Sequence, residues 1–146
     1  MTPARLAAAC DALLGGIDGR LVVVAPHASA AVVAFRARAA DAADTPVGAV
    51  IVWLGERGES ERRTAVLADV RARLPVGAPL VVVDYNQPRT RGRRWANALE
   101  LWLRGVPSSR ARYLVAREVA RSGFTVERAR LADGERLQLV RAVRAA

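Results

Sequence analysis

A helix, a glycine and a hairpin follow one another in residues 116–140, which read AREVARSGFTVERARLADGERLQLV. The amphipathic helix reaches Gly123, which suits a helix C-terminus because glycine accepts the left-handed backbone needed there. Residues 124–131 and 136–143 are strand-like, and the Ala-Asp-Gly-Glu sequence between them is a strong hairpin turn. The chain is therefore expected to end in two antiparallel strands.

Upstream of this hairpin, apolar strands alternate with amphipathic helices. A helix is expected over 3–14, capped by Thr2, and continuous apolar runs at 21–25, 49–54 and 79–84 are typical of strands buried on both faces. This alternation predicts a parallel sheet with right-handed crossovers. The helices after the three strands are marked, in turn, by Val32, Phe35 and Ala39; by Val66, Leu67, Val70 and Leu74; and by Trp95, Leu99, Trp102 and Leu103.

This order of elements resembles the class I S-adenosylmethionine-dependent methyltransferase fold, in which the final strand lies antiparallel between two earlier ones. The resemblance is carried by APLVVVD at 78–84, AREVARSGFTV at 116–126 and DGERLQLV at 133–140, and residues 48–55 are similar to the family's fourth strand. It implies an α/β, Rossmann-like, mostly parallel sheet with a C-terminal antiparallel hairpin. A single domain over 1–146 is expected.

The first third of the chain departs from that family. An active member has a glycine-rich loop after its first strand, whereas residues 25–30 read APHASA and contain no glycine. Only one strand is expected before Gly48, so the resemblance implies that strands two and three are missing, together with the acidic residue that holds the ribose. We expect no bound cofactor, or S-adenosylmethionine if the chain is active.

Composition narrows the class of protein. The 146 residues are 52% hydrophobic and 25% charged, as in a globular domain. A single cysteine, Cys10, excludes an internal disulfide, and the single histidine, His27, has no second ligand to form a metal site. No apolar run approaches the about 20 residues that cross a bilayer, and the N-terminus lacks the pattern of a signal peptide. These features predict a cytoplasmic protein with no membrane partner.

The net charge of +9 comes from 23 basic residues, all of them arginine. Such a charge is compatible with nucleic-acid binding. The absence of lysine and the abundance of alanine are also what a GC-rich genome produces through codon choice. Nucleic acid is therefore a possible but not a favoured partner.

Candidate site residues lie beyond the carboxyl ends of the strands, where ligands bind in open α/β sheets. The catalytic candidates are His27, as a general base, and Asp84, which could accept a substrate proton or orient Arg89. The alternatives are local hydrogen bonding by a loop histidine and turn formation before Pro88. The candidate cofactor contacts are Ser29, Trp53, Tyr85 and Asn86.

A run of arginines precedes the third of these helices. Arg89, Arg91, Arg93 and Arg94 would each oppose the helix dipole, at a cost of about 0.3–1 kcal/mol, which indicates an anionic partner group. A solvated loop that tolerates arginine is the alternative. Two tryptophans seven residues apart, at 95 and 102, share one helical face and are predicted to lie in the core, although an exposed pair would suit a protein interface.

Three functions follow from these features. The favoured one is a degenerate, non-catalytic subunit that binds or stabilises a catalytic methyltransferase, as a homo-oligomer or hetero-oligomer. Without strands two and three, the strand at 21–25 would be an apolar sheet edge, and such edges are normally covered. The alternatives are a minimal active methyltransferase and an arginine-rich nucleic-acid-binding module.

Overall fold

The computed structural model describes residues 2–25, 35, 38–41, 44–53, 60–103, 105 and 115–146. Five strands and four helices are defined within these ranges. In chain order they are α1 (Pro3–Leu14), β1 (Leu21–Val24), β2 (Gly48–Val52), α3 (Ser60–Arg73), β3 (Pro79–Tyr85), α4 (Arg91–Leu103), α5 (Val115–Arg121), β4 (Phe124–Ala132) and β5 (Leu137–Arg144).

The strands form one sheet in the order β1-β2-β3-β5-β4. β1, β2 and β3 are parallel, whereas β5 is antiparallel both to β3 and to β4. The last strand of the chain thus lies between two earlier ones, which confirms the predicted α/β sheet with its C-terminal hairpin.

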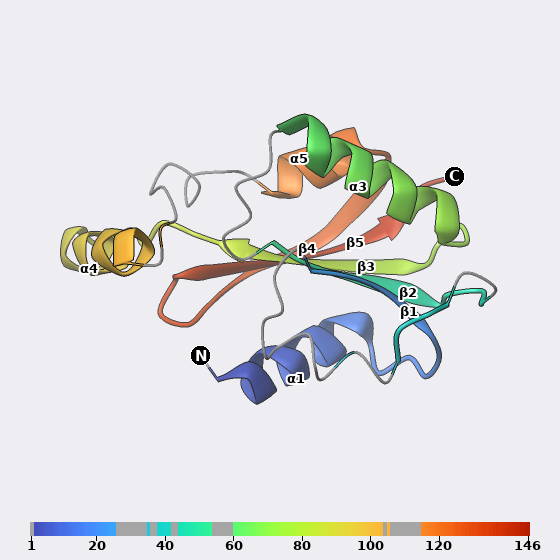
Figure 1. Ribbon diagram of the computed structural model, residues 1–146, viewed down its shortest axis with the longest axis horizontal. Coiled ribbons are helices and arrows are strands. Elements are labelled where there is room, and N and C mark those ends of the chain that lie inside the picture. Colours follow the sequence, from blue (N-terminus) through green and yellow to red (C-terminus); the bar gives the residue numbers. More distant parts are fainter. Residues whose placement is uncertain are drawn as a thin grey trace.

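Helices cover both faces of this sheet, with α1 on one side and α3 and α5 on the other (Figure 1). Because side chains alternate along a strand, each buried strand supplies both layers. In β3, Val81 and Val83 pack with α1 residues, while Leu80 and Val82 pack with residues of α3 and α5. This is why the strand sequences are continuously apolar.

The ends of α1 are fixed as the sequence predicts. Thr2 accepts a hydrogen bond from the backbone N–H of Arg5, and Gly15 ends the helix with a φ of 81°. Gly123, after α5, has a φ of 82°, which only glycine adopts readily.

The connection between β1 and β2 differs in part from the prediction. Ala39, expected on a helix, instead forms a parallel bridge with Leu21, whose N–H donates to Arg38 O over 2.7 Å. Phe35 is buried as expected, and Val32 lies outside the described residues. Among the described residues of this connection, the bridge is the only pairing to the outer edge of β1, so the sheet has the expected truncation.

The α4 helix corrects two further predictions. It begins at Arg91, so three of the four arginines predicted to precede the helix lie in its first turn. Its buried residues are Asn97 and Leu101, because α4 lies beyond the end of the sheet and contacts the molecule through one side only (Figure 1). The four residues predicted to mark its buried face are exposed: Trp95 by 74%, Leu99 by 45%, Trp102 by 72% and Leu103 by 71%. The prediction that both tryptophans lie in the core is therefore wrong.

No helix in the described part of the chain is both long and apolar enough to cross a membrane.

Candidate functional site

The carboxyl ends of β2 and β3 meet beneath α3 and α5. Trp53 follows β2, and its backbone N–H donates to Val83 O over 2.9 Å, which extends the strand pairing by one residue. Asp84 is the penultimate residue of β3 and alternates with Val83, so its side chain points to the α3 and α5 side. Trp53 and Asp84 are 1% and 3% exposed, so both are inside the molecule.

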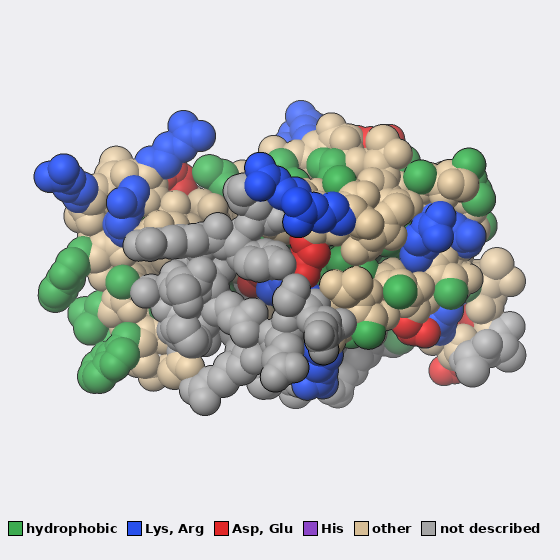
Figure 2. Space-filling model, turned by 90° about the horizontal axis from the view of Figure 1, so that it is seen from above, with side chains coloured by type: hydrophobic (Ala, Val, Ile, Leu, Met, Phe, Trp, Pro, Cys, Tyr) green, Lys and Arg blue, Asp and Glu red, His purple; other side chains and the backbone are tan. Residues whose placement is uncertain are grey.

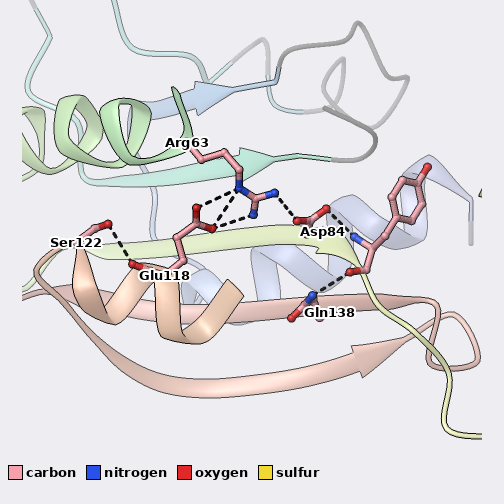
Figure 3. Close-up of polar contacts among 6 residues, drawn as sticks. Arg63, Asp84, Glu118, Ser122 and Gln138 are labelled. Carbon is pink, nitrogen blue, oxygen red and sulfur yellow. Dashed lines mark hydrogen bonds and ion pairs between the residues drawn. The ribbon is translucent and has the colours of Figure 1, made fainter. Parts of the chain in front are cut away.

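Arg63 of α3 connects Asp84 to Glu118 of α5 (Figure 3). Its Nη1 lies 2.9 Å from Asp84 Oδ2, and its Nη2 lies 2.9 Å from Glu118 Oε2. Its Nε donates to both carboxylate oxygens of Glu118 at 3.2 Å. All three side chains are buried, so one guanidinium neutralises part of the charge of two carboxylates. We call these three residues the ion cluster.

Trp53 forms the base of the ion cluster. The guanidinium carbon of Arg63 lies 3.9 Å from the centroid of the Trp53 ring, a cation–π geometry that favours the cation in a dry environment. The indole Nε1 of Trp53 is buried and makes no hydrogen bond within the described residues. The end of β2 is therefore filled by the chain's own side chains.

Within the ion cluster, burial has a larger effect on the pKa of Asp84 than the positive charge of Arg63 has. Burial raises the pKa of Asp84 from 3.8 to about 6, the charge and hydrogen bond of Arg63 lower it in part, and the nearby Glu118 raises it again. Removal from water therefore outweighs ion pairing at this carboxyl. A carboxyl with a pKa near 6 has the chemistry of an acid or base, but Asp84 is closed to solvent.

The residues after Asp84 tie β3 to the β4–β5 hairpin. Asp84 Oδ1 accepts from Tyr85 N over 2.8 Å, and Gln138 Nε2 donates to Tyr85 O over 2.8 Å. The side-chain amide of Asn86 donates to Glu135 O over 2.8 Å, and its backbone N–H donates to Arg136 O over 2.7 Å. Tyr85 and Asn86 thus position the hairpin.

A pocket of about 300 Å³ opens next to this junction. Asn86, Gln87 and Gln138 contribute its polar lining together with two arginines, Arg89 and Arg130. Small or apolar residues of α5 and β4 form the rest. Its complete lining is Asn86, Gln87, Arg89, Ala116, Ala129, Arg130, Leu131 and Gln138.

The arginine run lies across the start of α4: Arg89 precedes the helix, whereas Arg91, Arg93 and Arg94 lie in its first turn. Arg94 is turned back, and its guanidinium donates to the carbonyls of Pro88 and Arg89 at 3.4 Å. The backbone N–H of Arg89 donates to Glu135 Oε2 over 3.0 Å. None of the guanidinium groups of Arg89, Arg91, Arg93 and Arg94 forms an ion pair within the part of the chain that the structure describes.

The structure brings some predicted residues together and separates others. Trp53 and Asp84 meet at Arg63, so the partner of Asp84 is Arg63 and not Arg89. His27 and Ser29 lie outside the described residues. No group of three possible metal-ligating side chains occurs among the described residues.

Sequence reasoning missed Arg63 and Glu118, although a signal for both existed. Arg63 stands four residues before Leu67 on the apolar side of its helix, and Glu118 stands between the apolar Val115 and Val119. A charge on the buried face of an amphipathic helix needs a buried partner, because an unpaired charge in the core is costly.

Comparisons with known proteins identify the fold. No protein-family model and no curated protein matches the chain. Human N-acetylserotonin methyltransferase, solved with S-adenosylmethionine, is 12% identical with a TM-score of 0.54, covering 99% of this chain and 45% of its own. LepI, also solved with S-adenosylmethionine, is 10% identical with a TM-score of 0.58, and the match covers 99% of this chain and 41% of LepI. An O-methyltransferase family 2 protein from Planctomyces limnophilus, solved with apigenin, is 16% identical with a TM-score of 0.52. The match covers 86% of this chain and 42% of that protein.

These likenesses, together with the sheet order, show that the chain has a class I methyltransferase fold. The chain spans less than half the length of each of the three proteins.

Proposed function

We propose that this chain, which has the class I methyltransferase fold, is a non-catalytic subunit that binds and stabilises a catalytic methyltransferase. The observation that carries the proposal is the ion cluster. Together with Trp53, it fills the ends of β2 and β3, at the edge of the sheet where ligands bind in folds of this type.

The geometry of Asp84 supports a structural role. A general base must come within hydrogen-bond reach of the proton that it removes. Asp84 is 3% exposed, one of its oxygens faces Arg63, and the other accepts from the Tyr85 backbone. A substrate would have to displace Arg63 from two carboxylates to reach it.

The cofactor is the first test of the proposal. We expect no binding of S-adenosylmethionine at micromolar concentrations by isothermal titration calorimetry on the whole chain. Human N-acetylserotonin methyltransferase, which was solved with this cofactor, serves as the positive control. A clear one-site isotherm for this chain would contradict the proposal.

The pocket beside Asn86 favours a second function, a minimal active methyltransferase. It combines polar side chains with two arginines, Arg89 and Arg130, and a carboxylate-bearing ligand could pair with these guanidinium groups. If the calorimetry does detect the cofactor, Arg89→Gln should weaken its binding while Arg73→Gln, on the exposed end of α3, should not. If the two variants bind the cofactor with equal affinity, the pocket is not the cofactor site.

The partner is the second test. The probe is a methyltransferase encoded beside this chain, produced together with it. We expect the two to elute as one complex in size-exclusion chromatography, and the partner's melting temperature to rise, because a ligand that binds only the folded state stabilises it. Separate elution together with an unchanged melting temperature would contradict the proposal.

A further inference from the structure

The exposed apolar side of α4 has no counterpart elsewhere on the described surface. Trp95, Leu99, Trp102 and Leu103 lie on it, and we call these four residues the α4 surface. We propose that the α4 surface docks a protein partner that presents an apolar groove with carboxylates at one end. This inference rests on the proposed function and names the surface and the chemistry of the partner.

The spacing of the four residues is that of a helix that binds in a groove. They stand at positions i, i+4, i+7 and i+8, which places them along one side of the helix. Helices that dock into apolar grooves use anchors at this spacing, and tryptophan is enriched among the residues that carry most of the binding energy. Figure 2 shows apolar side chains gathered at the α4 end of the molecule, close to basic ones.

The opposite side of α4 is attached to the rest of the molecule. Leu101 is 1% exposed, and the Asn97 side chain donates to Asn86 O over 3.2 Å. Glu100 Oε2 lies 2.7 Å from Arg136 Nη1 of the hairpin. These contacts hold the helix in place, so the α4 surface is presented already folded and a partner need not order it.

Charge identifies the kind of partner. The first turn of α4 contains no acidic residue, and the guanidinium groups of Arg89, Arg91 and Arg93 form no ion pair within the described residues. Their positive charges add to that of the helix N-terminus. A partner carboxylate placed there would compensate both, as expected of complementary interfaces.

A second copy of the chain fits this surface less well. Each copy carries a formal charge of +9. The one acidic residue of α4, Glu100, already pairs with Arg136 and lies away from the α4 surface. Two α4 surfaces would therefore bring arginines together with no carboxylate of α4 to meet them.

A membrane surface also fits less well. Helices that lie in the lipid interface carry basic residues along their polar face. The arginines of α4 are confined to its first turn, and one of them, Arg94, is turned back to the carbonyls of Pro88 and Arg89.

The experiment compares the intact chain with the double variant Trp95→Ala/Trp102→Ala. Val76→Ala, at an exposed apolar residue remote from α4 in the chain, is the matched control. The probe is a synthetic helical-hairpin peptide whose two helices form a leucine-lined groove with glutamates at one end, and a second peptide has lysine in place of glutamate. We expect the acidic peptide to bind, its affinity to fall about 30-fold in the double variant, and the control to be unaffected. The lysine peptide should bind more weakly than the acidic one.

Other outcomes would overturn the inference. These are no binding of the acidic peptide, equal binding of both peptides, preferred binding to phosphatidylserine vesicles or duplex DNA, or a wild-type dimer that the double variant converts to a monomer. The co-produced methyltransferase separates this inference from the proposed function. If the methyltransferase binds the double variant as well as it binds the wild type, the proposed function stands and the assignment of the α4 surface is wrong. If the methyltransferase binds neither protein while the acidic peptide binds the wild type, the α4 surface stands and the proposed function is wrong.

Discussion

At the scale of residues, the ion cluster joins three elements that are far apart in the sequence. Arg63 on α3 reaches Asp84 on β3 and Glu118 on α5, so its guanidinium fixes how both helices lie on the sheet. A buried cluster of this kind adds little net stability over apolar residues, because the charges lose their hydration. Removing one member is far more costly, because it leaves the others buried and unpaired.

We therefore expect Arg63→Met to lower the free energy of unfolding by about 3–5 kcal/mol. Urea denaturation followed by circular dichroism measures this change. Arg62→Met is the matched control, since Arg62 is the exposed neighbour of Arg63 on the same helix, and it should stay within about 0.5 kcal/mol of the wild type. The triple variant Arg63→Met/Asp84→Asn/Glu118→Gln should recover part of the loss. A cost for Arg63→Met as small as that of the control would show that the ion cluster does not hold these elements together.

The carboxyl of Asp84 also makes stability depend on pH. Burial raises its pKa from 3.8 to about 6, so the folded protein holds this proton more tightly than the unfolded chain does. The free energy of unfolding should therefore rise as the pH falls from 7.5 to 5, by on the order of 1 kcal/mol from this group. Urea midpoints at both pH values measure the change, and Asp84→Asn should remove this contribution. The same pH dependence in the variant and the wild type would assign it to other groups.

At the scale of elements, strands were easier to predict than helix faces. The β-branched runs of β1, β2 and β3 define strands whichever partner covers them, because both of their sides are buried. In α4 the spacing of Trp95, Leu99 and Trp102 correctly predicts a helix with an apolar side. Periodicity does not show what that side contacts, and the molecule binds α4 through Asn97 and Leu101 instead.

The candidate site was predictable only in part, for a related reason. Asp84 could be identified because it ends a buried strand, at a position where α/β sheets bind ligands. The two residues that complete the ion cluster could not, because Arg63 and Glu118 are 55 residues apart and meet only where α3 and α5 cover the same face of the sheet (Figure 1). Charged residues on buried helix faces were the available clue.

The turn after α5 offers a test at this scale. Gly123 has a φ of 82°, and a Cβ there would lie 2.6 Å from Arg71 Nε, which donates to Gly123 O. Gly77, with a φ of 79°, has open space around it and is the matched control. Both alanine variants should lose about 1–2 kcal/mol to backbone strain, and Gly123→Ala should lose about 1 kcal/mol more with the Arg71 contact. Thermal unfolding by calorimetry compares them, and equal losses would show that the Arg71 contact contributes nothing.

At the scale of the whole molecule, the truncated sheet leaves β1 at its edge. On the outer side of β1, the backbone N–H of Leu21 donates to Arg38 O, and the backbone C=O of Leu21 accepts from Ala40 N. Two residues further, Val23 presents the same groups to the same side, and no described residue pairs with them. On β4, at the opposite edge, most side chains are exposed and three are charged, namely Glu127, Arg128 and Arg130, as in edges that avoid association. The two edges of the sheet are thus unequal, and the β1 edge is the one suited to pairing with another chain.

We accordingly expect the chain to associate with itself through the β1 edge, and Val23→Lys to abolish this self-association. Val23 is half-buried against the α1 side of the core, so the lysine stem can follow the apolar surface while the ammonium reaches water and repels a second strand. Light scattering gives the mass of each species, and an unchanged circular dichroism spectrum shows that the fold is intact. Leu131→Lys on β4 is the matched control, and it should associate like the wild type because that edge already repels strands. The Trp95→Ala/Trp102→Ala variant distinguishes this edge from the α4 surface, since self-association through β1 should survive in it. A wild-type chain that remains a soluble monomer on its own would contradict the expectation, because an unpaired β1 edge would then be stable in water.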